Sequence, residues 1–172
     1  VEPSPLLRQH GPSSNAVHLF RLPASGMLHA LVADHVVHGR VILPGSAYLE
    51  LARGAVHSVL TGDTSLRGVI FLQPLSMETP GLRLDCVVTS EQYEVRAGEV
   101  DGAGSLLNEL VYCSGAIAPQ TQLSLLPWEC ALSRGGQHLQ AADVSALYGS
   151  FDAAGLQYGP GFRTLDLAWG GD

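Results

Sequence analysis

The sequence contains no lysine, and its positive charge rests on nine arginines spread along 172 residues. Sixteen acidic side chains outnumber them, which gives a formal net charge of -7. Proteins that bind nucleic acid neutralise phosphates with clustered lysine and arginine side chains. The sequence has no such cluster, so nucleic acid is excluded from the partners that we expect.

Cysteine is scarce too: Cys86, Cys113 and Cys130 make an odd number, and no Cys-x-x-Cys pair occurs. This pattern fits neither a disulfide framework nor a zinc knuckle, whereas it fits a reducing cytoplasm. Long apolar runs are missing as well, because each is broken well before the roughly 18 residues that a membrane span needs. No basic region followed by an apolar block opens the sequence. We therefore expect a soluble, cytoplasmic protein.

Apolar residues are plentiful, at 46% of the sequence, which is enough for one globular domain with a substantial core. One set of them recurs at intervals of three and four residues and predicts the buried face of an α-helix: Tyr48, Leu51, Ala52, Ala55, Val56 and Val59. We expect Ser46 to cap this helix, Glu50 to lie in its first turn and Gly62-Asp63 to end it.

Short β-rich runs separated by turn signals lie on both sides of this helix. One spans residues 17–22 and precedes a segment that reads as a loop, and four more follow the helix at 68–72, 82–89, 92–96 and 106–118. We expect an antiparallel meander, then an irregular stretch over 119–136, and a second helix over 141–154 that ends at Gly155. This order indicates an α+β fold in which a sheet can wrap a helix.

The most specific pattern is the stretch from Asp34 to Gly45, Asp-His-Val-Val-His-Gly-Arg-Val-Ile-Leu-Pro-Gly. It resembles the signature of the dehydratase domains of modular type I polyketide synthases and of the animal fatty acid synthase dehydratase. A second motif of that family, Tyr-Gly-Pro-x-Phe, stands at 158–162, and shorter similarities lie in the same order at 4–7 and 71–75. The similarity therefore spans nearly the whole chain.

The resemblance implies a hotdog fold, an antiparallel sheet wrapped around a long central helix, and makes this chain the first half of a double hotdog. We expect residues 1–155 to form that N-terminal hotdog and residues 156–172 to hold the Tyr-Gly-Pro-x-Phe segment and the start of a linker to the second half. The implied partners are an acyl carrier protein, the other domains of the synthase, the second hotdog and a second copy in a homodimer.

The implied reaction is dehydration of a 3-hydroxyacyl thioester, carried on the phosphopantetheine of the acyl carrier protein, to the 2-enoyl thioester. It needs a base near neutral pKa, hydrogen-bond donors at the thioester carbonyl and an acid at the leaving oxygen, but no metal or further cofactor. The resemblance assigns the base to His35. The residues that we expect to bind substrate are Gly39, Pro44, Gly45, Tyr158, Gly159 and Pro160.

The backbone amide of Gly45 is the expected donor to the thioester carbonyl, since it lies where the helix begins. In the family the acid is an aspartate of the second hotdog, in an Asp-x-x-x-Gln or Asp-x-x-x-His motif. That motif does not occur here, because Asp166 is followed four residues later by Gly170. We therefore expect the acid to lie outside this sequence.

Other interpretations stay open for several residues. Asp34 is expected to be a structural carboxylate, because adjacent side chains in an extended segment point apart. A metal site of His29, Asp34 and His38 is a weaker alternative. The hydroxyl of Tyr158 either packs or hydrogen-bonds to substrate or to the acid. Related hotdog domains act as double-bond isomerases, cyclases or product templates, and a non-catalytic structural remnant is a further alternative.

Overall fold

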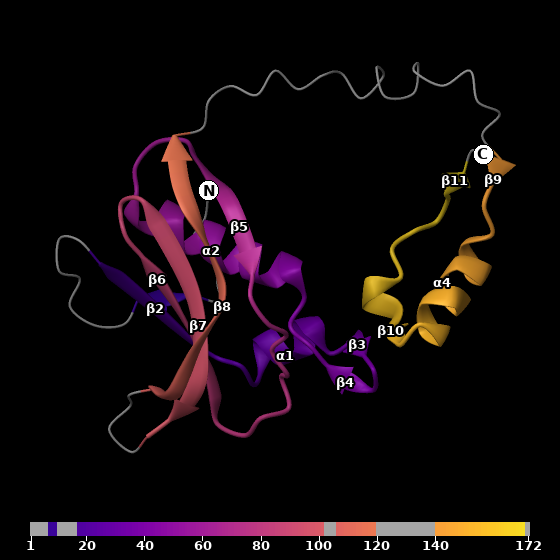
Figure 1. The fold of residues 1–172 in the computed structure, drawn as a ribbon, viewed down its shortest axis with the longest axis horizontal. Coiled ribbons are helices and arrows are strands. Elements are labelled where there is room, and N and C mark those ends of the chain that lie inside the picture. Colours follow the sequence, from indigo (N-terminus) through magenta and orange to yellow (C-terminus); the bar gives the residue numbers. More distant parts are fainter. Residues whose placement is uncertain (1–6, 10–16, 102–105, 120–139, 171–172) are drawn as a thin grey trace.

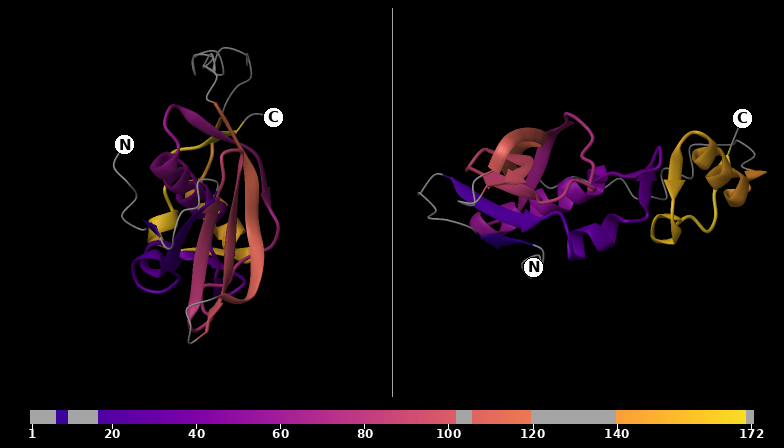
Figure 2. Two further views of the ribbon diagram at one scale, coloured as in Figure 1. Left: turned by 90° about the vertical axis from the view of Figure 1, so that its left-hand side faces the viewer. Right: turned by 90° about the horizontal axis from the view of Figure 1, so that it is seen from below.

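The computed structural model describes residues 7–9, 17–101, 106–119 and 140–170 (Figure 1). Six of the described strands form one antiparallel sheet in the order β1-β2-β6-β7-β8-β5. Their bounds are β1 Arg8–Gln9, β2 His18–Pro23, β6 Leu82–Val88, β7 Gln92–Val100, β8 Leu106–Pro119 and β5 Thr64–Phe71. The long helix α2, Gly45–Val59, lies against one face of this sheet, so the predicted α+β architecture is confirmed (Figures 1 and 2).

The core lies between α2 and the sheet. Along β6 and β7, every second side chain is buried against the helix, as the pleat of a strand requires. On α2, five residues of the predicted face are buried and Val59 packs at the edge of the same cluster. The periodicity of the sequence was therefore sufficient to locate the core face of the helix.

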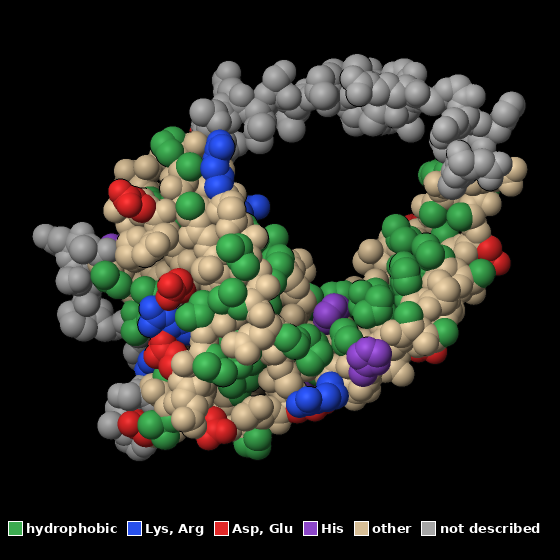
Figure 3. All heavy atoms as spheres, in the orientation of Figure 1, with side chains coloured by type: hydrophobic (Ala, Val, Ile, Leu, Met, Phe, Trp, Pro, Cys, Tyr) green, Lys and Arg blue, Asp and Glu red, His purple; other side chains and the backbone are tan. Residues whose placement is uncertain are grey.

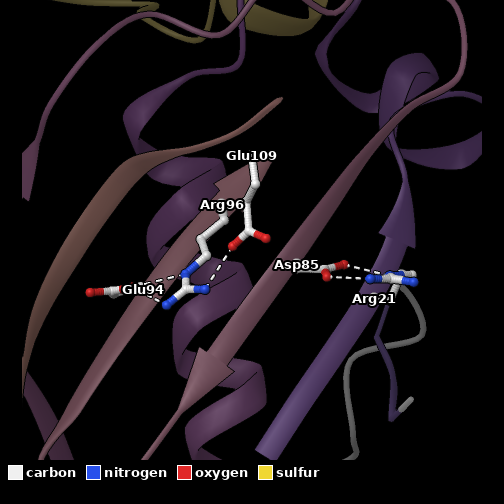
Figure 4. A network of polar contacts seen from close by, with 5 residues as sticks. All are labelled: Arg21, Asp85, Glu94, Arg96 and Glu109. Atoms are coloured by element: carbon white, nitrogen blue, oxygen red, sulfur yellow. Dashed lines mark hydrogen bonds and ion pairs between the residues drawn. The ribbon is translucent and has the colours of Figure 1, made fainter. Parts of the chain in front are cut away.

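The opposite face of the sheet carries ion pairs (Figure 4). Arg21 on β2 donates two hydrogen bonds to the Asp85 carboxylate on β6, at 2.7 and 2.6 Å, and the two residues are direct cross-strand neighbours. Arg96 on β7 joins Glu94 and Glu109 on the same face. Asp85 is only 4% exposed, so its charge depends on the bidentate pair with Arg21.

Three details of the predicted helix and its entry are wrong. Pro44, with φ -72° and ψ 152°, is the N-cap of α2, and Ser46 makes no capping hydrogen bond. The first turn of α2 holds no acidic residue, so Glu50 lies beyond it. The segment before the motif contains a helix, α1 (Met27–Val32), where we expected a loop. In this helix of six residues only Leu28 and Val32 are buried, and two apolar residues four apart are too few to show a helical period in the sequence.

The predicted meander holds for β6, β7 and β8 but not for β5. Strand β5 pairs with β8 at the far edge of the sheet, and its register shifts between Arg67 and Ile70 around Gly68, which has φ +57°. In the chain, β5 follows α2 and is followed by β6. In the sheet, however, β5 pairs with β8, so its neighbour in the sheet is not its neighbour in sequence. No helix among the described residues is long and apolar enough to cross a membrane.

A second group of elements lies beside the sheet and its helix, at the other end of the molecule (Figures 1 and 2). It joins β10 (Leu156–Tyr158) to the hairpin of β3 (His35–Val37) and β4 (Arg40–Val41) in the order β10-β3-β4. The other members are α4 Val144–Ala153, the 3-10 helix η1 Pro160–Phe162, and the paired strands β9 Gln140–Ala141 and β11 Trp169–Gly170.

The second predicted helix is confirmed as α4, which is followed by Ala154 as C-cap and by Gly155 with φ +86°. This positive φ explains why glycine follows the cap. Helix α4 packs against β10, so it belongs to the group of elements formed by residues 140–170, called here the C-terminal group. The division at residue 155 stays a prediction, and most of the predicted irregular stretch over 119–136 lies outside the described residues.

Candidate active site

The hairpin of β3 and β4 carries His35 at its first position. Val36 pairs with Val41 and Val37 with Arg40, so the two strands are joined by His38 and Gly39 alone. Both have positive φ, 48° and 74°, which is the conformation of the tight two-residue turns that match strand twist. The spacing from His35 to Gly39 is therefore set by the length of the hairpin.

The His35 imidazole is held by the strand that follows the turn. Its Nδ1 donates to the backbone carbonyl oxygen of Ile42 at 2.7 Å, and the amide of Ile42 donates to the His35 carbonyl at 3.1 Å. Because a carbonyl oxygen only accepts, the neutral imidazole carries its hydrogen on Nδ1 and its lone pair on Nε2. A histidine oriented in this way can take a proton at Nε2.

Two aromatic rings from the distant second motif lie beside the imidazole and contact each other, with their centroids 6.2 Å apart. Tyr158 on β10 lies opposite His35 in the antiparallel register, and its ring centroid is 5.5 Å from the imidazole, nearly parallel at 26°. The Phe162 ring is 5.1 Å away and tilted by 53°. The structure thus brings the two sequence motifs together around His35.

Asp34, the residue directly before His35, is not a second acid or base of the site, because it holds the second motif in place. Its Oδ2 accepts the amide of Gly161 at 2.7 Å, and its backbone carbonyl accepts the amide of Gly159 at 2.8 Å. The structural role predicted for Asp34 is confirmed. Gly159 and Pro160 lie in the turn that Asp34 holds, and Pro160 opens η1.

Pro44 and Gly45 begin α2 a short distance beyond Ile42. Pro44 is buried as the N-cap, and Gly45 is the first residue of the helix, where backbone amides have no intrahelical acceptor. A cavity of about 400 Å³ opens here, lined by Ile42, Leu43, Gly45, Tyr48, Phe71, Leu72, Gln73 and Pro74. Ile42 therefore both holds the imidazole and contributes to this cavity.

The cavity is walled by two aromatic side chains whose rings are 5.9 Å apart, Tyr48 and Phe71. Burial raises the pKa of the Tyr48 hydroxyl above its ordinary value, so it stays a neutral phenol at physiological pH. Among the described residues this hydroxyl has no hydrogen-bond partner. A Cβ on Gly45 would meet the Phe71 ring first, at 3.2 Å, so glycine here leaves room for that ring.

Gly39 lies apart from this cavity. Its amide donates to the Gln157 side-chain oxygen at 2.7 Å, so the bond ties the tip of the hairpin to β10. The space-filling view shows histidine side chains where the β3–β4 hairpin meets the C-terminal elements (Figure 3). In the described part of the chain, no group of three or more His, Cys, Asp or Glu side chains is arranged to hold a metal ion.

Three contacts in and around the site were missed by sequence reasoning. The carbonyl of Ile42 carries no side-chain signal, and Gln157 lies directly before the Tyr-Gly-Pro-x-Phe motif and not within it. Phe162 could have been found, because it is the last residue of the Tyr-Gly-Pro-x-Phe motif, but its place against His35 depends on a fold contact between segments 127 residues apart.

A family profile described as "Polyketide synthase dehydratase domain" matches residues 4–101 of this chain. The chain belongs to this family. Polyketide synthase PksN of Bacillus subtilis is 27% identical over 147 residues, which cover 78% of this chain and 3% of that synthase. Polyketide synthase GfsE of Streptomyces halstedii is 30% identical over 152 residues, 82% of this chain and 4% of the synthase.

Solved structures agree on the fold. The dehydratase domain from the CurF module of the curacin polyketide synthase has a TM-score of 0.80 at 20% identity, over 99% of this chain and 64% of that one. The PpsC dehydratase domain of Mycobacterium tuberculosis has a TM-score of 0.78 at 22% identity, over 99% and 60%. The predicted family and hotdog fold are confirmed, and the chain spans less than two thirds of these dehydratase domains.

Proposed function

We propose that this domain dehydrates a 3-hydroxyacyl thioester in polyketide biosynthesis, with His35 as the general base. The observation that carries the proposal is the hydrogen bond from His35 Nδ1 to the carbonyl of Ile42, at 2.7 Å. It fixes the tautomer and the direction of the ring, and it leaves Nε2 to accept a proton. The hairpin, the start of α2 and the cavity beside Ile42 supply the rest of the site.

The proposed reaction moves two protons. Nε2 of His35 takes the proton from the α carbon, and the electrons of that bond pass toward the thioester carbonyl oxygen. The Gly45 amide at the start of α2 stabilises the charge that develops there. As the carbon–carbon double bond forms, the 3-hydroxyl is protonated and leaves as water, which gives the 2-enoyl thioester. In this proposal Pro44 shapes the entry to the helix, and Tyr158, Gly159 and Pro160 bind the substrate.

The acid that protonates the hydroxyl belongs, in this proposal, to a second hotdog. The described Asp34 carboxylate is already engaged by Gly161. Among the similar solved structures, the CurK dehydratase is described in two inactive mutants, one with histidine replaced by phenylalanine and one with aspartate replaced by asparagine. Strand β5 ends the described sheet with Ile70 and Phe71 more than half exposed, an edge that a second half would cover.

The proposed substrate carrier is the phosphopantetheine arm of an acyl carrier protein, and the reaction uses no metal or further cofactor. The similar PpsC domain was solved with C12:1-CoA, which supports a thioester ligand for this one. The relatives are polyketide synthases in which this chain matches 3–4% of the length, so other synthase domains are its context. We further propose that the parent synthase is a cytoplasmic homodimer.

The test is His35→Phe in the complete dehydratase domain, assayed for conversion of a 3-hydroxyacyl thioester to the 2-enoyl product. Loss of the general base should lower turnover by about 10² to 10⁴ while the circular dichroism spectrum stays unchanged. His38→Asn is the matched control, since His38 lies in the same hairpin and asparagine tolerates its positive φ of 48°. A folded His35→Phe domain that keeps more than about a tenth of wild-type turnover would contradict the proposal.

A further inference from the structure

We propose that the Asp34 carboxylate is a positioning group that places the Phe162 ring against His35. The inference rests on the proposed role of His35 as base. It gives a function to Asp34, the residue directly before the histidine, which accepts hydrogen bonds from the turn at residues 159–161.

The two rings beside the imidazole are placed by different means. Tyr158 belongs to β10 and is paired with His35 in the register of the sheet, so the strand itself sets its position. Phe162 lies four residues further along, after the strand has ended and the chain has turned through Pro160. Strand pairing therefore cannot fix Phe162, and the turn must return it to the imidazole.

Asp34 holds that turn on both sides of Pro160. Its carbonyl accepts the Gly159 amide at 2.8 Å, and its Oδ2 accepts the Gly161 amide at 2.7 Å. From there the amide of Phe162 donates to the carbonyl of Gly159 at 3.0 Å, which closes the helical turn. Only Gly161 and Phe162 therefore connect the Asp34 carboxylate to the Phe162 ring.

The two glycines of the turn are fitted to the same carboxylate. A Cβ on Gly159 would fall on the Asp34 carboxyl group, and a Cβ on Gly161 would lie 3.1 Å from its Oδ2. Neither glycine has a positive φ. Backbone conformation therefore does not require glycine at these positions, whereas close approach to Asp34 does.

The Phe162 ring matters because it limits the motion of the base. With Nδ1 bonded to the Ile42 carbonyl and rings at 5.1 and 5.5 Å from its centroid, the imidazole has one favoured orientation. Removal of one ring would widen the range of directions of Nε2, and a small misplacement of a catalytic group reduces rate more than substrate binding.

The first experiment compares three variants of the complete dehydratase domain. Asp34→Ala should lower kcat about tenfold with KM changed less than about twofold, because only positioning is lost. Asp34→Asn keeps an oxygen for the Gly161 amide and should stay within about threefold of wild type. Gln157→Ala is the control: it removes the bond from Gly39 between the same two segments without touching the turn, and it should leave kcat near the wild-type value.

The second experiment is a double-mutant cycle with Phe162→Ala. If Asp34 acts through the ring, Asp34→Ala should cost less than about twofold in kcat once Phe162 is already alanine. Equal costs of Asp34→Ala in both backgrounds, or an Asp34→Asn variant as impaired as Asp34→Ala, would overturn the inference.

The third measurement does not depend on turnover. The ring currents of Tyr158 and Phe162 shift the NMR signals of the His35 imidazole protons, so Asp34→Ala should move these signals toward the values found in Phe162→Ala. Unchanged signals in Asp34→Ala would refute the positioning role even in an active enzyme. An active His35→Phe domain would instead refute the proposed function and leave the NMR result standing.

Discussion

Gly45 and Phe71 are fitted to each other: a Cβ added to Gly45 would lie 3.2 Å from Cζ of the Phe71 ring. Gly45 is the first residue of α2, and Phe71 is the last residue of β5, at the edge of the sheet. Their close approach places an aromatic wall beside the helix start where we propose that the thioester carbonyl is bound. Glycine at residue 45 thus leaves the space that the Phe71 ring occupies.

Gly45→Ala should lower activity without loss of stability. The new methyl group would push the Phe71 ring aside and reshape the cavity, so kcat/KM should fall about tenfold. Stability should stay equal or rise by up to about 1 kcal/mol, because alanine is favoured over glycine in a helix. Turnover assays and thermal unfolding of the complete domain measure the two effects. Gly45→Ala combined with Phe71→Leu should recover part of the activity, and no recovery would show that Phe71 is not the group displaced.

The buried ion pair on the outer face of the sheet should contribute strongly to stability. Arg21→Ala removes both hydrogen bonds from a carboxylate that is 4% exposed, which should cost about 3 kcal/mol of the free energy of unfolding. Arg96→Ala on the same face removes pairs whose side chains are about a third exposed, and should cost about 1 kcal/mol or less. Urea unfolding measures both. Equal costs would show that burial does not distinguish the two pairs.

The free energy of unfolding should fall above pH 9. Burial raises the pKa of the Cys86 thiol from 9.0 to about 12, so between these values the folded protein keeps a proton that the unfolded chain has lost. The contribution of this thiol is complete below pH 9 and is lost as the pH rises toward 12. The slope for one such group is about 1.4 kcal/mol per pH unit, and Cys86→Val should reduce it. Unfolding curves between pH 8 and pH 11, with identical slopes for variant and wild type, would contradict this assignment.

The sequence was sufficient where side chains repeat or form a motif. The spacing of Tyr48, Leu51, Ala52, Ala55 and Val56 located the buried face of α2, and the two motifs located His35 and Tyr158. Helix α1 was missed because two buried residues, Leu28 and Val32, are too few to define a period. The N-cap was misplaced because Pro44 begins the helix through its backbone conformation, without a capping side chain.

The remaining contacts of the site are made by backbone groups or depend on the fold. The carbonyl of Ile42 holds His35, and any residue type supplies such a carbonyl. The place of Gly39 at the substrate stays a prediction from the motif, while the structure shows its amide bonded to Gln157 and its φ of 74° in the hairpin turn. A motif therefore identifies which residues belong to the site. The contacts that each of them makes there depend on how distant segments, such as the hairpin and β10, pair in the fold.

The junction between the hairpin and the C-terminal group gives the last prediction. Gly155 follows α4 with φ +86°, its carbonyl accepts the His38 amide at 2.7 Å, and a Cβ here would collide with the His38 ring. Gly155→Ala should therefore strain the backbone by about 1–2 kcal/mol and separate β10 from β3. Because β10, which carries Tyr158, and the turn that leads to Phe162 follow directly after Gly155, turnover should fall with little change in the unfolding of the six-stranded sheet. Gly149→Ala is the matched control, since Gly149 lies on α4 and a Cβ there meets nothing within 4 Å. Hydrogen exchange should be faster at residues 156–158 in Gly155→Ala and unchanged in Gly149→Ala. Normal protection of these amides in an inactive Gly155→Ala domain would show that the junction acts on catalysis by a route other than the docking of β10.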